Sequence, residues 1–319
     1  MAQVIHMSAN EHDLTVHGCF TQGIYRDVYP AINPGQTALS QKGKVVLITG
    51  ASRGIGKDGI VPAFALAGAR ALIITAREAS TLNETVANVR STNPLIEILA
   101  LELDISKESS VVAAFKTIAD HFPEGVDILV SNAGSLASSG QYLASCDSHK
   151  WWETDLTTNI RGTMLLTKNF LSLSSPVTRD KPRKRYIVYI TSGTSFIVNP
   201  GESGYSLSKL SITQMAAFAH AESTEFLTVQ AIAVHPGIFA TDMVDEMYHF
   251  YAKDTPELAG AVINWAATDQ AEFMSGRYTA ANWDVNELLQ RKAEILRRNL
   301  LTVKLGGVED GGYTAKVLG

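Results

Sequence analysis

Tyr205 and Lys209, four residues apart in the run Tyr-Ser-Leu-Ser-Lys, are the residues whose types and spacing most directly indicate chemistry. On a helix, residues four apart lie on one face, so the phenol and the ammonium would point into the same cleft. A nearby cation favours the phenolate and lowers the pKa of a phenol from its ordinary value of about 10. Together with Ser192, located 13 residues before Tyr205, and a glycine-rich turn further upstream, the pair predicts a site for hydride-transfer chemistry.

A glycine-rich turn lies far upstream of this pair, with the sequence Thr49-Gly50-Ala51-Ser52-Arg53-Gly54-Ile55-Gly56. It follows an apolar run and precedes an Ala-rich segment ending near Gly68, an order that predicts strand, turn and helix. Glycines let the backbone turn tightly and approach a pyrophosphate, which the amides and dipole of a helix N-terminus attract. Taken alone, each motif has a plainer interpretation: a solvated helix face for Tyr-x-x-x-Lys and a structural loop for the turn.

Four further motifs occur in the rest of the chain: Asp104 after the apolar strand 96–103, Asn132-Ala133-Gly134 after the strand 126–130, Asn159 in a long helix, and Pro236-Gly237 after the strand 227–234. With these motifs the chain resembles a classical short-chain dehydrogenase/reductase, in particular the fungal NADPH-dependent members with an N-terminal extension. The resemblance covers about Lys44 to Asp284.

The resemblance implies an enzyme that reversibly reduces a ketone or aldehyde to an alcohol. Tyr205 would donate the proton to the carbonyl oxygen, and Ser192 would hydrogen-bond that oxygen. Lys209 would lower the tyrosine pKa and hold the nicotinamide ribose, while Asn159 would anchor a water in the proton relay. No metal is expected. The residues expected to bind the cofactor are Gly50, Ser52, Arg53, Ile55, Gly56, Arg77, Asp104, Ile105, Asn132, Ala133, Gly134, Tyr205, Lys209, Pro236, Gly237, Ile238 and Thr241.

The choice between NADPH and NADH can be argued from charge. After the second strand the chain reads Thr75-Ala76-Arg77, so the acidic residue that would bond an adenosine ribose hydroxyl is absent there. Arg77 and Arg53 instead supply guanidinium groups whose planar geometry suits a 2′-phosphate. The sequence therefore favours NADPH over NADH, with two ordinary surface arginines as the alternative.

The pattern of apolar runs predicts an α/β fold, a three-layer Rossmann-type doubly wound parallel sheet. Runs of four to eight apolar residues alternate with helical stretches, which is typical of βαβ units whose sheet is covered on both faces. The expected strands are 45–49, 71–75, 96–103, 126–130, 186–191, 227–234 and 277–281. One catalytic domain, residues 44–284, would carry an N-terminal extension of residues 1–43 and a helical C-terminal extension of residues 285–319.

Two features depart from the family pattern. Pro62 falls inside the helix after the glycine turn, where proline removes a backbone hydrogen bond, so we expect a kinked or late-starting helix. The segment Ser174 to Arg185 carries five basic residues and widens the distance between Asn159 and Ser192. A solvated loop is favoured there over nuclear import or anion binding.

Amino-acid composition limits the expected binding partners and the expected cellular compartment of the protein. The 319 residues include 27 basic and 32 acidic side chains, for a net charge of −5, so nucleic acid is not an expected partner. Two cysteines are too few for a disulfide framework or a structural zinc site, which fits the cytoplasm. Residues 1–43 resemble an extended arm, or a disordered tail over the first 20, rather than a signal peptide or membrane span. Two long helices, about 151–172 and 203–222, predict a homodimer or homotetramer by resemblance to the family.

The substrate is expected to be a small molecule that is bulky and apolar or aromatic, like a secondary metabolite. Met243 to Tyr251, within a predicted substrate lid of about residues 241–275, is rich in Met and aromatic residues. Phe196 to Val198 could line the opposite wall, and packing on the core is the alternative for both segments. His235 and His249 are given no role. Two other functions remain open: a non-redox dehydration, isomerisation or cyclisation in a biosynthetic pathway, and a nucleotide-sensing regulator.

Overall fold

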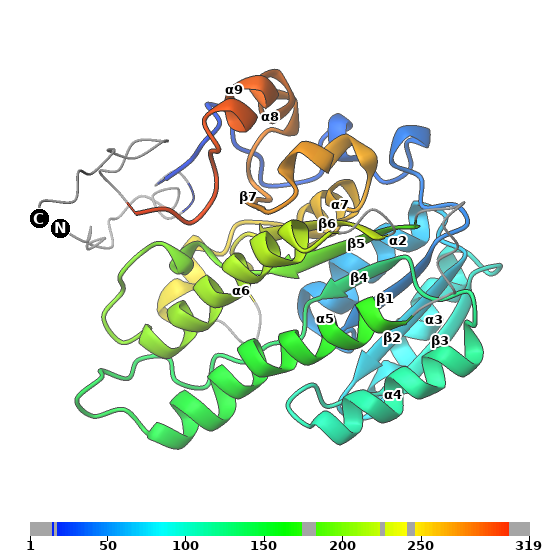
Figure 1. Cartoon of the computed structure of the whole chain (residues 1–319), viewed down its shortest axis with the longest axis horizontal. Coiled ribbons are helices and arrows are strands. Elements are labelled where there is room, and N and C mark those ends of the chain that lie inside the picture. Colours follow the sequence, from blue (N-terminus) through cyan, green and yellow to red (C-terminus); the bar gives the residue numbers. More distant parts are fainter. Residues whose placement is uncertain (1–14, 16–17, 174–182, 224–226, 241–245, 306–319) are drawn as a thin grey trace, which may run out of the picture.

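The computed structural model describes residue 15 and residues 18–173, 183–223, 227–240 and 246–305. Its centre is a parallel sheet of seven strands in the order β3-β2-β1-β4-β5-β6-β7, with helices on both faces (Figure 1). The strand order reverses between β1 and β4, which is where doubly wound sheets bind their ligands. The predicted three-layer α/β fold is confirmed.

The strands match the apolar runs of the sequence to within a few residues. They are β1 (Val45–Thr49), β2 (Ala71–Ala76), β3 (Glu97–Glu102), β4 (Ile128–Ser131), β5 (Arg183–Ile190), β6 (Leu227–His235) and β7 (Arg277–Ala280). Ile48 is in register with Val130 of β4, and Val130 with Val188 of β5. Since all the strands run in the same direction, the residues that follow β1, β4, β5 and β6 meet at one edge of the sheet.

Helices form two layers over separate apolar cores. One layer contains η3 (Gly56–Ile60), α2 (Val61–Leu66), α3 (Asn83–Thr92) and α7 (Pro256–Ala266). The other contains α4 (Glu108–His121), η5 (His149–Gly162), α5 (Thr163–Ser172) and α6 (Ser203–Ala221). The shorter elements are η1 (Pro30–Ile32), η2 (Thr37–Leu39), η4 (Ala79–Leu82), η6 (Gly193–Ser195), η7 (Glu246–Tyr251), η8 (Asp269–Met274), α8 (Val285–Gln290) and α9 (Lys292–Arg297). Within the described ranges, no helix combines the length and apolar character that crossing a bilayer requires.

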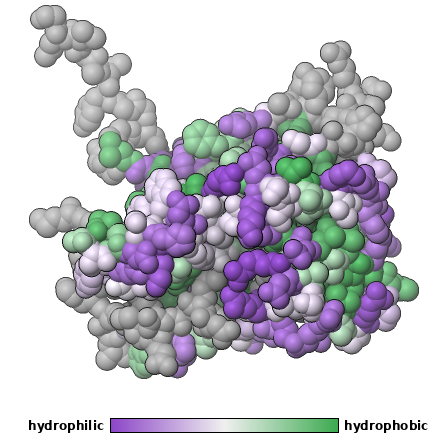
Figure 2. All heavy atoms as spheres, turned by 90° about the horizontal axis from the view of Figure 1, so that it is seen from below, coloured by the Kyte–Doolittle hydropathy of each residue, from purple (hydrophilic) through white to green (hydrophobic). Residues whose placement is uncertain are grey.

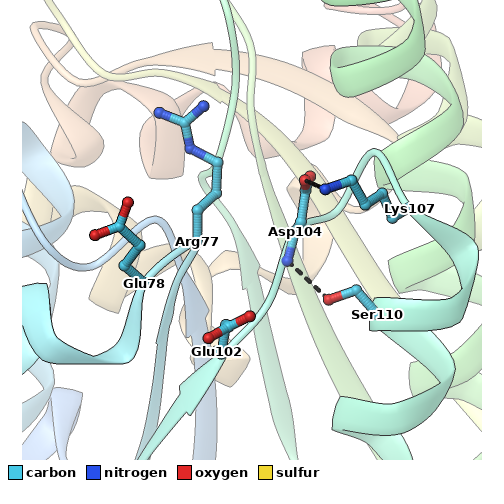
Figure 3. Close-up of a pocket in the computed structure, with 6 residues that line it drawn as sticks. All are labelled: Arg77, Glu78, Glu102, Asp104, Lys107 and Ser110. Carbon is cyan, nitrogen blue, oxygen red and sulfur yellow. Dashed lines mark hydrogen bonds and ion pairs between the residues drawn. The ribbon is translucent and has the colours of Figure 1, made fainter.

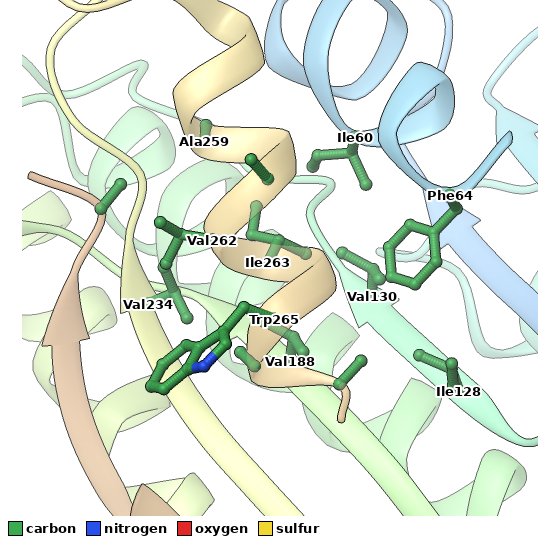
Figure 4. Close-up of a cluster of buried hydrophobic side chains, with 14 of the residues drawn as sticks. Ile60, Phe64, Ile128, Val130, Val188, Val234, Ala259, Val262, Ile263 and Trp265 are labelled. Atoms are coloured by element: carbon green, nitrogen blue, oxygen red, sulfur yellow. The ribbon is translucent and has the colours of Figure 1, made fainter. Parts of the chain in front are cut away.

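Helix α7 fills the centre of the first core. Val262, Ile263 and Trp265 point from α7 onto the strands, and Ile60 and Phe64 approach from η3 and α2 (Figure 4). All five side chains are buried to 1% exposure or less. This packing fixes the helix that follows the glycine-rich turn against the sheet.

The helix around Pro62 is disturbed, as the sequence predicts. Pro62 lies in the first turn of α2, directly after the π-helical η3, where the Val61 N–H bonds the Gly56 carbonyl five residues earlier. A wider turn accommodates the proline ring, which would otherwise crowd the preceding carbonyls. The glycine-rich turn ends at Gly56, the first residue of η3, so the rest of the turn precedes this distortion.

Not all of the basic residues in the segment 174–185 are solvated. Residues 174–182 lie outside the described residues, but Arg185 belongs to β5 and is 2% exposed, which corrects the expectation that its charge is solvated. Its guanidinium donates to the carbonyls of Val126 (2.9 Å) and Phe170 (3.0 Å) and also to that of Leu173. The cation therefore satisfies the last carbonyls of α5, where the helix dipole favours positive charge.

The N-terminal arm, described from Gly18 onward, packs beside α7 and α8 at the β7 side of the sheet (Figure 1). Ile24 pairs with Trp283 in an isolated antiparallel bridge. The Tyr29 hydroxyl donates to the Trp283 carbonyl (3.1 Å) and accepts from the Val285 N–H (2.8 Å). The arm thus joins the chain that follows β7.

We predict that Gly260→Ala destabilises the protein, because η3 and α7 cross with their main chains in contact. A Cβ on Gly260 would lie 2.1 Å from the Gly59 carbonyl oxygen. Overpacking of this kind costs about 2–3 kcal/mol of the free energy of unfolding, measurable by urea denaturation. Gly68→Ala is the control, because Gly68 has φ +76° and lies in an open position with no atom within 4 Å of an added Cβ. It should cost only about 1 kcal/mol, and equal losses for the two variants would contradict the close crossing.

Candidate active site

Ser192, Tyr205 and Lys209 come together at the carboxyl edge of the sheet. Ser192 follows β5, and its Oγ accepts hydrogen bonds from the Thr194 N–H (3.2 Å) and hydroxyl (3.0 Å). Tyr205 and Lys209 lie on the first two turns of α6, and the Tyr205 phenol is hydrogen-bonded to Ser192. Lys209 donates from Nζ to the Ile190 carbonyl (2.8 Å), with Nζ 5.5 Å from the centre of the Tyr205 ring. The predicted spacing does place these groups in one cluster.

The electrostatics of Tyr205 differ from the sequence-based expectation. Burial raises the pKa of the phenol well above its ordinary value, and the charges of Glu202 and Asp155 raise it further, while the Ser192 hydrogen bond lowers it. Burial also lowers the pKa of Lys209 to about 8, with Asp155 opposing this shift. Desolvation is the largest influence on the phenol in this arrangement, and the lowering of its pKa by Lys209 stays a prediction. A phenol that stays protonated can donate a proton.

Asn159, in η5, is fully buried and holds two neighbouring segments. Its amide nitrogen donates to the Ser135 carbonyl (2.9 Å) and to Ser208 Oγ (2.9 Å), and its oxygen accepts from the Ser135 N–H (2.8 Å). Both amide hydrogens and the oxygen thus have protein partners. The side chain ties the turn after β4 to helix α6, and its role in anchoring a water stays a prediction.

Asp155 is a site residue that the sequence analysis missed. Its carboxylate is 0% exposed and accepts four hydrogen bonds, from the Ser135 hydroxyl, the Ala137 N–H, and the Ser138 N–H and hydroxyl, at 2.6–2.8 Å. It therefore shapes the turn after β4 and places a negative charge near Tyr205 and Lys209. The available signal was its position four residues before Asn159, on the same helix face.

The turns after β1 and β4 are joined by Asn132. Its side-chain nitrogen donates to the carbonyls of Thr49 (2.8 Å) and Gly50 (3.0 Å), and the main-chain N–H groups of Asn132 and Ala133 donate to Thr49 Oγ1. A Cβ on Gly56 would lie 2.1 Å from the Gly50 carbonyl oxygen. The turn residues Ser52, Arg53 and Ile55 lie between β1 and η3, at the start of the helix, where main-chain N–H groups favour an anion.

Arg77 and Asp104 line a pocket of about 460 Å³ beyond the ends of β2 and β3. Figure 3 shows both side chains extending in the same direction from these neighbouring strands. Asp104 is paired with Lys107 (3.2 Å), while Arg77 is exposed. The remaining lining residues are Glu78, Glu102 and Ser110. The lining does not include Arg53, and the carboxylates of Glu78 and Glu102 would oppose the binding of a phosphate there. Ile105 is buried beside Gly162 of η5.

Pro236, Gly237 and Ile238 follow β6 at the same edge of the sheet, while Thr241 lies outside the described residues. Before them, His235 lies beside Gly193, and its Nδ1 atom is buried without a hydrogen-bond partner within the described part of the chain. Burial lowers the pKa of this imidazole to about 4, although the charge of Asp254 opposes the shift. His235 is therefore neutral at physiological pH.

The residues expected at the substrate are divided between surface and core. Phe196 and Val198 are 50% and 55% exposed, so they are not packed in the core, and Phe196 meets Tyr278 edge-on with ring centres 5.0 Å apart. Of the segment 243–251, residues 243–245 lie outside the described residues, Phe250 is half exposed and Tyr251 is buried. Among the described residues, no group of three or more His, Cys, Asp or Glu side chains could hold a metal ion.

Comparison with known proteins identifies relatives of this arrangement. The family model described as short chain dehydrogenase matches residues 44–252. The short chain dehydrogenase mpl6 of Monascus purpureus is 36% identical, over 88% of this chain and 94% of its own length. The short chain dehydrogenase pigC of Monascus ruber is 32% identical, over 89% of this chain and 93% of its own.

Solved structures share the fold. A short-chain type dehydrogenase/reductase from Mycobacterium marinum superposes with a TM-score of 0.67 at 22% identity, covering 76% of this chain and 95% of its own. A Shigella flexneri 2a protein solved in complex with NADP gives a TM-score of 0.64 at 20% identity, covering 77% of this chain and 99% of its own.

We predict that His235 contributes to acid sensitivity. The unfolded chain, with a histidine pKa of about 6.5, binds more protons than the folded chain down to about pH 4. This contribution to stability is therefore complete above about pH 6.5 and is lost as the pH falls toward 4. His235→Gln should flatten the pH dependence in that window by up to about 3 kcal/mol, measured by urea unfolding between pH 4.5 and 7.

The control is His149→Gln, which replaces an exposed histidine outside the cluster and should leave the slope unchanged. An unchanged slope in His235→Gln would show that His235 is not buried in its neutral form.

Proposed function

The chain belongs to the short chain dehydrogenase family, and from this premise we propose that it reversibly reduces a ketone or aldehyde to an alcohol with NADPH. The observation that carries the proposal is the cluster of Ser192, Tyr205 and Lys209 at the carboxyl edge of the sheet. A dehydration, isomerisation or cyclisation would not require this complete set. The assignment of the chain as an oxidoreductase follows from its family.

The residues present fit a dinucleotide at this edge. The turn after β1 presents main-chain N–H groups at the start of a helix, and Arg53 and Arg77 are exposed cations with no ion pair among the described residues. Anions are stabilised by such groups. When bound, NADPH would supply the hydride, with Asn132, Gly134 and Lys209 beside its ribose and nicotinamide.

In the proposed mechanism, Tyr205 is the acid. Its raised pKa keeps the phenol protonated, so that it can transfer the proton to the carbonyl oxygen as negative charge develops there. Ser192, oriented by Thr194, donates to the same oxygen. Asn159 and Asp155 hold the turn after β4 and the start of α6 in place, which preserves the alignment of these groups.

We propose a bulky substrate that is apolar or aromatic, like a secondary metabolite. Phe196 and Val198 provide exposed apolar surface within six residues of Ser192, and Phe250 adds an exposed aromatic ring. The two relatives compared above, from Monascus purpureus and Monascus ruber, are fungal short chain dehydrogenases. Screening ketones of increasing ring size for NADPH oxidation, with identification of the alcohol product, tests both the reaction and this preference.

The proposal includes a homodimer or homotetramer in the cytoplasm. Exposed apolar side chains occur on the helices expected to pair, namely Trp152 on η5, Met164 on α5, and Leu207 and Phe218 on α6. The face seen from below has apolar side chains gathered toward one end, beside charged ones (Figure 2). Such patches are typical of protein contacts.

We predict that Tyr205→Phe lowers turnover by about 10²-fold or more, because the ring and its packing remain while the donated proton is lost. The NADPH dissociation constant should stay close to that of the wild type. Tyr189→Phe is the matched control, because it removes a buried hydroxyl that contacts Thr167 (2.9 Å) outside the cluster. Steady-state kinetics in which both variants keep wild-type turnover would refute the mechanism.

We predict that Arg77→Ala weakens NADPH binding by roughly 10- to 150-fold and leaves NADH binding almost unchanged. A charge-assisted hydrogen bond to the 2′-phosphate is worth about 1.5–3 kcal/mol, and NADH has no such phosphate. Glu78→Gln, in the same pocket, should shift NADPH affinity in the opposite direction by removing a repulsive charge.

The measurement is fluorescence titration of each cofactor at fixed ionic strength. Arg90→Ala, which removes an exposed arginine of α3, serves as the control for net charge. Equal losses for NADPH and NADH in Arg77→Ala would assign Arg77 to the adenine pocket, and a wild-type preference for NADH would overturn the choice of cofactor.

A further inference from the structure

The carboxylate of Asp254 joins three segments that are far apart in the sequence. Its Oδ1 accepts from the Arg26 guanidinium of the N-terminal arm (2.8 Å) and from the Asn282 amide after β7 (2.8 Å). Its Oδ2 accepts from the main-chain N–H of Ile238, in the turn after β6 (2.6 Å). One side chain therefore connects the arm to a turn at the proposed cofactor site.

Asp254 also closes the segment that begins at Ile238. Besides the bond to its carboxylate, its own main-chain N–H donates to the Ile238 carbonyl (3.2 Å). Gly237 has φ of +105°, and a Cβ there would lie 2.6 Å from Asp254 Oδ2. Asp254 thus holds the main chain at Gly237 and Ile238 in place, and its contacts leave no room for a side chain on Gly237.

Burial makes this carboxylate dependent on its partners. The Asp254 side chain is 0% exposed and that of Arg26 is 20% exposed. A buried carboxylate that loses its cation is strongly disfavoured, and it regains solvation only by moving away from its other partners. The Ile238 N–H would then lose its acceptor.

The arm is anchored where Arg26 emerges. Asn282 donates to the Tyr25 carbonyl (2.8 Å) and accepts from the Tyr25 N–H through its own carbonyl (2.8 Å), while the Arg26 carbonyl accepts from the Thr255 N–H (2.9 Å). Arg26, Asp254 and Asn282 all lie outside residues 44–252, the part matched by the family model. These contacts therefore belong to the parts of this chain that flank the matched segment.

We propose that Arg26 and Asp254 are positioning residues of the active site, through which the N-terminal arm holds the Pro236-Gly237-Ile238 turn in the shape that binds the cofactor. The arm would thus contribute to the active site by holding this turn in place. The link to cofactor binding rests on the proposed function, whereas the effect on the turn itself does not.

The test compares full-length Arg26→Met with the wild type by hydrogen–deuterium exchange. Without Arg26, Asp254 moves away and the Ile238 N–H loses its charged acceptor. Exchange in the peptide covering residues 235–240 should therefore become faster by about tenfold or more. The NADPH dissociation constant should rise by about tenfold, since only the fraction with the turn in place binds. Arg26→Lys, which keeps the charge, should lie closer to the wild type in both measurements.

Asp27→Ala is the matched control, because Asp27 also ties the arm to the domain, through Thr255 Oγ1 (2.8 Å), without touching Asp254. It should leave exchange at residues 235–240 unchanged. An unchanged peptide in Arg26→Met, or an equal rise in the peptides of β1 and β5, would overturn the proposal. A wild-type protein that binds neither NADPH nor NADH would instead refute the proposed function, and the exchange result would still decide the role of Arg26.

Discussion

The candidate active site depends on hydrogen bonds that join the turns at the carboxyl ends of β1 and β4. Asn132 bonds the carbonyls of Thr49 and Gly50, so the two turns hold each other at a fixed distance. From the second turn, Ser135 is bonded to Asn159, and Asn159 to Ser208 on α6. A continuous network therefore connects the glycine-rich turn to helix α6, which carries the proposed proton donor Tyr205. A parallel sheet makes this possible because its strand ends meet at one edge.

Burial decides the protonation of the cluster more than any single charge does. It raises the pKa of Tyr205 and lowers that of Lys209, so both groups are moved toward their neutral forms. Asp155 acts on both, since its negative charge disfavours the phenolate and favours the ammonium. The same carboxylate accepts four hydrogen bonds from the turn after β4. Structure and electrostatics are thus tied together at one residue.

The strands and the Ser192, Tyr205 and Lys209 cluster could be predicted from the sequence because their signals are local. Apolar runs define buried strands, and a spacing of four residues defines a helix face. Arg185 and Asp254 could not be predicted in the same way, because their partners are main-chain groups distant in sequence, such as the Phe170 carbonyl and the Ile238 N–H. The direction of the Tyr205 pKa shift could not be predicted either, because a sequence reveals a neighbouring cation but not the loss of solvent around the phenol.

The parts of the chain that flank the family-matched segment pack against one another. Glu287 of α8 accepts from the N–H groups of Gln22 and Gly23, and the Arg291 guanidinium lies 3.6 Å from the centre of the Phe20 ring. The arm is therefore held at several points, so that Arg26 is presented to Asp254 from a braced segment. A long, flexible side chain loses less entropy on forming an ion pair when its backbone is already ordered. This bracing explains how an arm outside the sheet can fix a buried carboxylate at the edge where the chemistry is expected.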